Sequence, residues 1–128
     1  MKLFKNIQPD FIDERGAIAK ILDDGKTNIK SILLITSAKG TIRANHYHKK
    51  DSHYCYLVSG KIEYTEQPVD KSSTLETAIL ESGDMIFSPP MVMHAFRFLE
   101  DTVFWAFATE SRRQTDYESD TVRVNLIS

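Results

Sequence analysis

The sequence predicts an all-β protein, built as a sandwich or a barrel of short strands. Apolar residues alternate with polar ones or form short runs, and no long stretch has the 3.6-residue period of an amphipathic helix. Turn-forming residues interrupt these segments at intervals of roughly 8–12 residues, which is typical of antiparallel strands joined by tight turns. With 128 residues the chain is long enough for one domain with its own core.

The predicted strands run along most of the chain. They cover residues 17–22, 30–36, 41–48, 53–59, 61–67, 74–80, 85–87, 94–99, 103–109 and 121–125. Turn chemistry separates them, for example at Gly25, Gly83 and the pair Pro89-Pro90. The polar segment 111–120 is predicted to be a loop or a short helix.

Two turns are predicted to close β-hairpins. A two-residue turn ending at Gly60 would pair Val58 with Lys61. A four-residue loop after His48 would set His48 opposite His53. Both pairings place successive strands side by side in one sheet.

Alternation along these strands predicts which side chains share a face. The inward set is His46, His48, His53, Cys55, Leu57, Ile62, Tyr64 and Glu66. By the same parity His94 shares a face with Phe96 and Phe98. Three separate strands therefore point histidines into one interior.

All four histidines lie in two short clusters, His46, His48 and His53 in the first and His94 in the second. Histidine is the commonest metal ligand, and residues i and i+2 of a strand point the same way with Cα atoms roughly 6–7 Å apart. The four imidazoles are therefore predicted to bind one divalent transition metal ion, and zinc, iron, nickel, manganese and copper all suit such a site. The alternative is that His53 lies on the surface at a turn and His94 is a hydrogen-bonded core residue.

Glycines and a proline frame both clusters at fixed spacing. The patterns Gly-x5-His-x-His-x4-Glu-x6-Gly and Gly-x5-Pro-x-Gly-x2-His-x3-Asn are matched at Gly40, His46, His48, Gly60, Gly83, Pro89 and His94. These are the two cupin motifs, and the chain resembles that family over residues 40–60 and 83–98. The resemblance implies a single cupin domain over residues 1–128, an antiparallel jelly-roll β-barrel with its site in the barrel mouth.

Three positions depart from the cupin motifs. His53 replaces the usual glutamate ligand, Met91 the second motif's glycine, and Phe98 its asparagine. His53 can still bind a metal, which would give a four-histidine site. Phe98 is not a ligand position, so its effect is on packing.

A narrower resemblance rests on Asp13-Glu14-Arg15-Gly16, on the segment 43–50 and on Pro89-Pro90. The chain is similar there to cupins that act on nucleotide-linked sugars, namely dTDP-4-keto-sugar epimerases, 3,4-ketoisomerases and the C-terminal cupin domain of capsular polysaccharide enzymes. This implies an isomerase or epimerase of a nucleotide-linked keto-sugar in surface polysaccharide biosynthesis. Arg43 would then bind phosphate, and His46 or His48 would move the proton. Two features differ, since Ala44 replaces a glycine and the segment 103–107 lacks the tyrosine acid of the 3,5-epimerases.

Such a reaction removes a proton next to a keto group, which needs a base near the carbon and positive charge or donors near the enolate oxygen. A histidine base and Arg43 would suffice without metal, whereas a metal ion would itself polarise the carbonyl. An imidazole whose lone pair binds a metal cannot accept a proton. The predicted catalytic residues are therefore His46 and His48, or, if all four histidines bind metal, Tyr64, Glu66 or a metal-bound hydroxide.

Four residues are predicted to contact the substrate: Arg43, Lys49, Cys55 and Phe96. Lys49 would attract an anionic substrate, although lysines on a polar turn are more often only solvated. Cys55 lies near the first histidine pair, and its alternative role is that of a buried structural thiol. Phe96 belongs to the aromatic core and could stack on a ring.

Composition excludes some partners. The formal net charge of −2 leaves no basic excess for nucleic acid. No apolar run approaches membrane-spanning length, no signal peptide opens the chain, and the single cysteine cannot form an internal disulfide, so we expect a cytoplasmic protein. Apolar residues on the outward parity, Tyr54, Tyr56 and Val58, together with the run 32–35, predict a homodimer formed by sheet packing.

Two other functions stay open at this point. One is a metal-dependent dioxygenase that cleaves a small organic substrate at a four-histidine iron, manganese or copper centre. The other is a cupin that binds a small molecule without catalysis. Arg43 and the segment 13–16 favour the sugar isomerase, whereas His53 in place of glutamate does not distinguish the first two.

Overall fold

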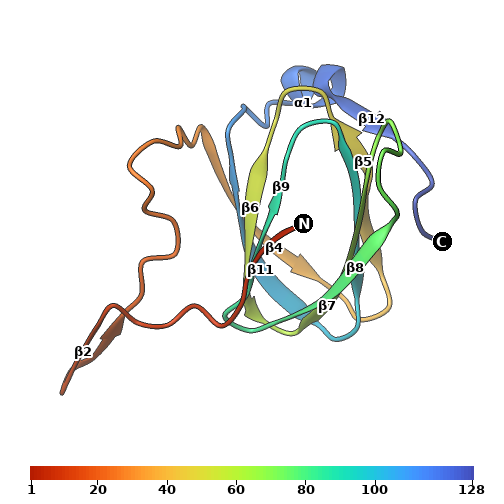
Figure 1. Ribbon diagram of the computed structural model, residues 1–128. Helices are drawn as coiled ribbons and strands as arrows, with labels where there is room; N and C mark the ends of the chain where they lie inside the picture. The colour runs from red at the N-terminus through yellow and green to blue at the C-terminus, as the bar shows by residue number, and fades with distance from the viewer.

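Two five-stranded antiparallel sheets pack face to face in the computed structural model, which describes residues 1–128 (Figure 1). The first sheet consists, in spatial order, of β1 (Lys2–Phe4), β9 (Met85–Ser88), β6 (His53–Ser59), β11 (Thr102–Ala108) and β4 (Ser31–Ser37). The second sheet consists of β12 (Thr121–Arg123), β5 (Ile42–His48), β10 (Val92–Phe98), β7 (Lys61–Pro68) and β8 (Glu76–Glu81). A short hairpin of β2 (Phe11–Asp13) and β3 (Gly16–Ile18) and one helix, α1 (Gln114–Asp120), complete the structure.

The predicted all-β architecture is confirmed, and most predicted strands are present with small shifts at their ends. The polar segment 111–120 contains α1, the short helix that was one of its two predicted states. The predicted strand 17–22 is wrong, because only Gly16–Ile18 is extended and it pairs with β2 in the separate hairpin. No helix has the length and apolar character that crossing a membrane requires.

The predicted hairpin pairings are wrong. β5 pairs with β10 and β12, whereas β6 pairs with β9 and β11, so His48 and His53 lie in different sheets. In the same way β6 and β7 belong to different sheets, and the chain crosses between them at Gly60. Alternation fixes the face of a side chain but not the partner strand, and each of these turns crosses from one layer of the sandwich to the other.

The predicted inward face is nevertheless right, because crossing between layers preserves which side chains point inward. On the outward face Tyr54 is not uncovered as predicted, since it is only 6% exposed and packs against Phe87 with a ring-centroid distance of 4.7 Å. All eight residues of the predicted inward set are buried. The core between the sheets consists of Cys55, Leu57, Ile62, Tyr64, Leu80, Ile86, Phe96, Phe98, Phe104 and Ala106. Phe96 lies at its centre, with ring-centroid distances of 5.3 Å to Tyr64 and 5.8 Å to Phe104. This aromatic packing fills the sandwich beneath the histidines.

The segment before β4 leaves the sandwich and carries the β2–β3 hairpin away from it (Figure 1). Three large apolar side chains of the hairpin are exposed, Phe11 at 51%, Ile12 at 71% and Ile18 at 62%. Two strands of three residues each do not form a stable hairpin on their own. The arm is therefore a part of the chain whose apolar surface has no cover within one copy.

Candidate metal centre and ligand cavity

α1 covers one end of the sandwich (Figure 1). The four histidines meet between the two sheets at that end, where the Tyr117 ring of α1 lies 5.8 Å from the ring of His48. His46 and His48 lie on β5, and His94 lies beside His46 on β10. His53 begins β6 on the facing sheet. All four are buried, with 1–8% of each residue exposed. The structure thus brings together the four residues that the sequence predicts as metal ligands.

Three of these imidazoles can hold a metal ion. The ligand nitrogens of His46, His48 and His94 all lie within 4.8 Å of one another. The fourth imidazole is close as well, since Nε2 of His53 lies 3.2 Å from Nε2 of His94. Two nitrogens bound to one tetrahedral ion at about 2.0–2.1 Å stand roughly 3.3 Å apart, so this separation fits two ligands of one ion.

Hydrogen bonds orient two of the rings with their Nε2 lone pairs toward the cluster. Nδ1 of His48 lies 3.2 Å from Thr121 Oγ1 and 3.5 Å from Asp120 Oδ2. Because Thr121 Oγ1 donates its own hydrogen to Tyr117 O, it accepts one from His48 Nδ1. Nε2 of His48 then carries a lone pair, and this atom is buried without a hydrogen-bond partner. A buried acceptor without a partner fits a site that a metal ion fills.

His94 has the same tautomer. Its Nδ1 donates to the carbonyl oxygen of Val92 at 3.2 Å, which leaves the lone pair on Nε2. A histidine ligand usually donates its second ring N–H in this way to a carbonyl or a carboxylate. The donor set and its outer partners therefore match a nitrogen-rich metal centre.

The imidazoles are neutral at physiological pH. Burial lowers the pKa of His46 to about 2, that of His94 to about 3 and that of His48 to about 4. Burial also lowers the pKa of His53 well below its usual value. The positive charge of Arg112 acts in the same direction on all four rings. Neutral imidazoles keep their lone pairs available to a metal ion.

A cavity of about 340 Å³ opens beside the cluster, a size typical of small-molecule sites. Its polar end is lined by His46, His53, His94, Arg112 and Tyr117. The rest of the wall consists of Leu33, Ile35, Arg43, Ala44, Cys55, Phe96, Phe104 and Ala106. His48 does not line the cavity, so its ring lies behind the other imidazoles.

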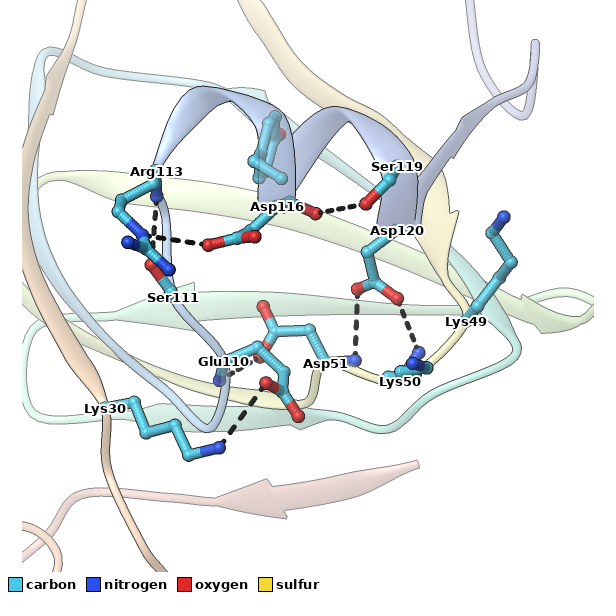
Figure 2. Close-up of a pocket in the computed structure, with 11 residues that line it drawn as sticks. Lys30, Lys49, Lys50, Asp51, Glu110, Ser111, Arg113, Asp116, Ser119 and Asp120 are labelled. Atoms are coloured by element: carbon cyan, nitrogen blue, oxygen red, sulfur yellow. Dashed lines mark hydrogen bonds and ion pairs between the residues drawn. The ribbon is translucent and has the colours of Figure 1, made fainter.

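The predicted substrate contacts fall in two different places. Arg43, Cys55 and Phe96 line the cavity. Arg43 already donates to Ser37 Oγ at 2.6 Å and to the carbonyl oxygen of Thr36 at 3.0 Å. Lys49 lies elsewhere, on the polar hollow of Figure 2.

Tyr64 and Glu66, the predicted alternative bases, do not line the cavity. Tyr64 is fully buried in the core and its hydroxyl lies 2.9 Å from Ser88 Oγ, while burial raises the pKa of both residues. Both side chains point inward as predicted, but β7 lies on the far side of β10 from β5. Alternation along a strand predicts which face a side chain is on, but not where its strand lies in the sheet. The sequence therefore could not show that Tyr64 and Glu66 do not line the cavity.

The polar hollow of about 620 Å³ lies between α1 and the loop after β5 (Figure 2). Its charges are largely paired, with Lys30 3.6 Å from Glu110 and Arg113 3.0 Å from Asp116. Asp120 accepts hydrogen bonds from two backbone N–H groups of the loop, at 2.8 and 3.1 Å. The hydrogen bonds of Asp120 in this hollow therefore attach α1 to the loop after β5, above the histidines.

Arg112 and Tyr117 also line the cavity, although neither is among the residues predicted for the site. The Tyr117 ring centre lies 5.8 Å from that of His48 and 6.3 Å from that of His46. The Arg112 guanidinium carbon lies 5.1 Å from the Tyr117 ring centre. Both residues belong to the polar segment 111–120, which has neither a motif nor a periodicity that could mark them.

The paired sheets form a jelly-roll sandwich with the histidine cluster at one end. No protein-family model and no curated protein matches the sequence, whereas solved structures match the fold. The chain is similar to dTDP-4-dehydrorhamnose 3,5-epimerase from Sulfolobus tokodaii, with a TM-score of 0.75, 23% identity and coverage of 91% of this chain and 73% of that one. It is also similar to the sugar 3,4-ketoisomerase QdtA from Thermoanaerobacterium thermosaccharolyticum, solved with TDP, with a TM-score of 0.73, 19% identity and coverage of 97% and 88%.

A third similar structure is the capsular polysaccharide assembling protein CapF from Staphylococcus aureus. The TM-score is 0.67 and the identity 18%, over 91% of this chain and 34% of CapF. The predicted jelly roll and the predicted structural resemblance to nucleotide-sugar cupins are therefore confirmed. The likeness establishes the fold alone, because one fold hosts many activities and the chemistry depends on the residues of the site.

Proposed function

We propose that this protein is a metal-binding isomerase or epimerase that acts on a nucleotide-linked keto-sugar in surface polysaccharide biosynthesis. The observation that carries the proposal is the buried imidazole cluster at the end of a cavity of small-molecule size. The similar folds support the substrate class, because they include an epimerase of a dTDP-linked sugar and a ketoisomerase solved with TDP. Arg43, at the cavity wall, is the proposed contact for the nucleotide phosphates.

In this proposal His46, His48 and His94 hold the metal ion, with His53 available as a fourth ligand. Bound there, a divalent transition metal would supply Lewis acidity to a keto oxygen. Asp120 and Thr121 orient His48 through its Nδ1. The protein side of the site is thus arranged before any ligand enters.

The reaction begins with one proton transfer. The C–H proton next to the keto group passes to a base, and the electron pair of that bond forms the enolate. Return of a proton to the opposite face of the same carbon gives the epimer. Return of a proton to the former keto carbon gives the isomer, in which the hydroxyl group on the first carbon loses its proton to become the new keto group and the enolate oxygen gains one. Imidazoles with their lone pairs on a metal cannot carry this proton.

We therefore assign the proton transfer to Tyr117 in place of Tyr64 and Glu66. Its ring lines the cavity next to His46, and tyrosine is an established proton carrier in enzymes. As a phenolate, Tyr117 would accept the C–H proton, and the phenol that results would return a proton to the enolate carbon.

A second candidate is a metal-dependent dioxygenase of a small organic substrate. The observation in its favour is the all-nitrogen donor set, in which His53 stands 3.2 Å from His94 at the position where cupins have a glutamate. Such a set suits iron, manganese or copper as well as zinc. Oxygen uptake by the iron-loaded protein with diketones or catechols would favour this candidate, and a protein that binds nucleotide sugars without any turnover would be a binding module.

We further propose that the protein is a cytoplasmic homodimer. Ile32 and Leu34, 63% and 57% exposed, form an apolar outer surface on the edge strand β4. The hairpin arm adds a second uncovered apolar surface (Figure 1). Sedimentation of the wild type and of a Leu34→Glu variant tests the assembly, since the charge should shift the protein to monomer.

Solvent exchange tests the proposed function without knowledge of the product. The metal-loaded protein is incubated in D₂O with TDP-4-keto-6-deoxyglucose, the sugar bound in one QdtA structure, and with other nucleotide-linked keto-sugars. We expect deuterium at a carbon next to the keto group, and none with a His48→Gln, His94→Gln double variant. Absence of exchange across the whole panel would contradict the proposed function.

A further inference from the structure

Arg112 places a guanidinium at the polar end of the cavity with most of its donors unused. Its side chain is only 19% exposed, and it lines the cavity together with His46, His53 and His94. Of its five N–H donors, the ion pair of Nη2 with Asp51 Oδ2 at 3.1 Å uses one. Nε is buried and has no hydrogen-bond partner. A largely buried cation with free donors is costly unless a ligand pairs with them.

The other arginine of the cavity is different. Arg43 is exposed, and its Nε and Nη2 donate to Ser37 Oγ and to the carbonyl oxygen of Thr36. Two of the donor nitrogens of its guanidinium are therefore directed toward β4. The guanidinium with free donors near the imidazoles is that of Arg112.

The structure also holds Arg112 in place. Asp51 accepts hydrogen bonds from the backbone N–H groups of Thr109 and Glu110, each at 3.1 Å, which fixes the chain directly before Arg112. The Tyr117 ring lies 5.1 Å from the guanidinium carbon and limits its movement on that side. A donor that is positioned before the ligand arrives stabilises developing charge without reorganisation.

We propose that Arg112 binds an anionic oxygen of the ligand at the imidazole end of the cavity. Under the proposed function, on which this assignment rests, that atom is the enolate oxygen formed when the carbon next to the keto group loses its proton. The same planar fork recognises a carboxylate or a phosphate oxygen. The competing role is structural, with Arg112 serving only to neutralise the buried Asp51.

Exchange kinetics separate these roles. Arg112→Gln should slow deuterium exchange by about 100- to 1,000-fold, as loss of one oxyanion donor does, while the Kd for TDP changes less than about twofold. Arg112→Lys keeps the positive charge but not the planar guanidinium. Its exchange rate should lie between those of the wild type and Arg112→Gln. Arg113→Gln is the matched control, because this neighbouring side chain is 82% exposed and pairs with Asp116 outside the cavity. An exchange rate in Arg112→Gln equal to that in Arg113→Gln would overturn the proposal.

A binding measurement decides the point even if the protein has no turnover. In the metal-stripped wild type, the ¹⁵N–¹H signal of Arg112 Nε, identified by its loss in Arg112→Gln, is followed while malonate or inorganic phosphate is added. A shift with malonate supports the proposal, and a wild type that shows the shift but no exchange would refute the proposed function alone. A shift with phosphate only would overturn the enolate assignment in favour of a phosphate contact. No shift with either anion would overturn the proposal altogether.

Discussion

Nε2 of His53 lies 3.2 Å from Nε2 of His94, and this contact joins the two sheets at the centre of the site. Since His94 donates through Nδ1 to Val92 O, its Nε2 accepts a hydrogen from His53 when no metal is bound. Nδ1 of His53 then carries a lone pair, which the Cys55 thiol can meet at 3.3 Å. A metal ion would replace the His53–His94 hydrogen bond with two metal–nitrogen bonds.

The carboxylate behind His48 should strengthen metal binding. Asp120→Asn removes the charge that lies 3.5 Å from His48 Nδ1, so we expect a loss of about 10- to 100-fold in metal affinity. Competition with a chromophoric chelator measures the Kd. Asp116→Asn, on the same helix but paired with the exposed Arg113, is the control and should bind as the wild type does. Equal affinities for the wild type and Asp120→Asn would show that the Asp120 carboxylate does not strengthen metal binding through His48.

The metal-free protein should lose stability as the medium becomes acidic. Unfolded histidines take up a proton near pH 6.5, whereas the folded pKa values are about 4 for His48, about 3 for His94 and about 2 for His46. Between these pH values the unfolded chain binds more protons than the folded one. The free energy of unfolding therefore decreases as the pH is lowered, by up to about 1.4 kcal/mol per pH unit for each histidine. Urea unfolding at several pH values measures the slope, and His94→Gln should reduce it. A constant free energy from neutral pH to about pH 5 would mean that the imidazoles are accessible to protons.

Tyr117→Phe removes the proposed proton carrier and keeps the ring. We expect deuterium exchange to slow by about 100- to 10,000-fold, with metal content and TDP affinity unchanged. Tyr47→Phe serves as the control, because Tyr47 lies between His46 and His48 on β5 and points to the opposite face. Undiminished exchange in Tyr117→Phe would assign the proton transfer to another group.

Gly60 makes the sharp crossing from β6 to β7, and alanine should not be tolerated there. Its φ of +104° is unfavourable for other residues, and a Cβ would lie 2.6 Å from the carbonyl oxygen of Asp101. We expect Gly60→Ala to reduce the free energy of unfolding by roughly 2–5 kcal/mol. Gly25→Ala is the control, since φ is +71° there but no atom lies within 4 Å, and its cost should be about 1–2 kcal/mol. Chemical denaturation compares the two, and equal losses would show that φ alone matters.

The sequence predicts the inward side chains because a strand alternates with a period of two whichever sheet it joins. It does not predict that His48 and His53 lie in different sheets, because a short polar turn can either close a hairpin or cross between layers. The same limit applies to Tyr64 and Glu66, whose parity is right but whose strand lies away from the cavity. Arg112 belongs to a polar segment without a hydrophobic pattern, and its ion pair with Asp51 helps to hold it at the site. The two residues are far apart in the sequence, so this contact could not be predicted.

We infer that His46 and His48 of β5 and His94 of β10 bind one metal ion. Elemental analysis of protein purified without a histidine tag and dialysed against trace metal tests it most directly. We predict about one equivalent of a divalent transition metal per chain in the wild type, and a large loss in His48→Gln and in His94→Gln. A folded wild type that retains no metal after exposure to zinc, iron, nickel, manganese and copper would contradict the account.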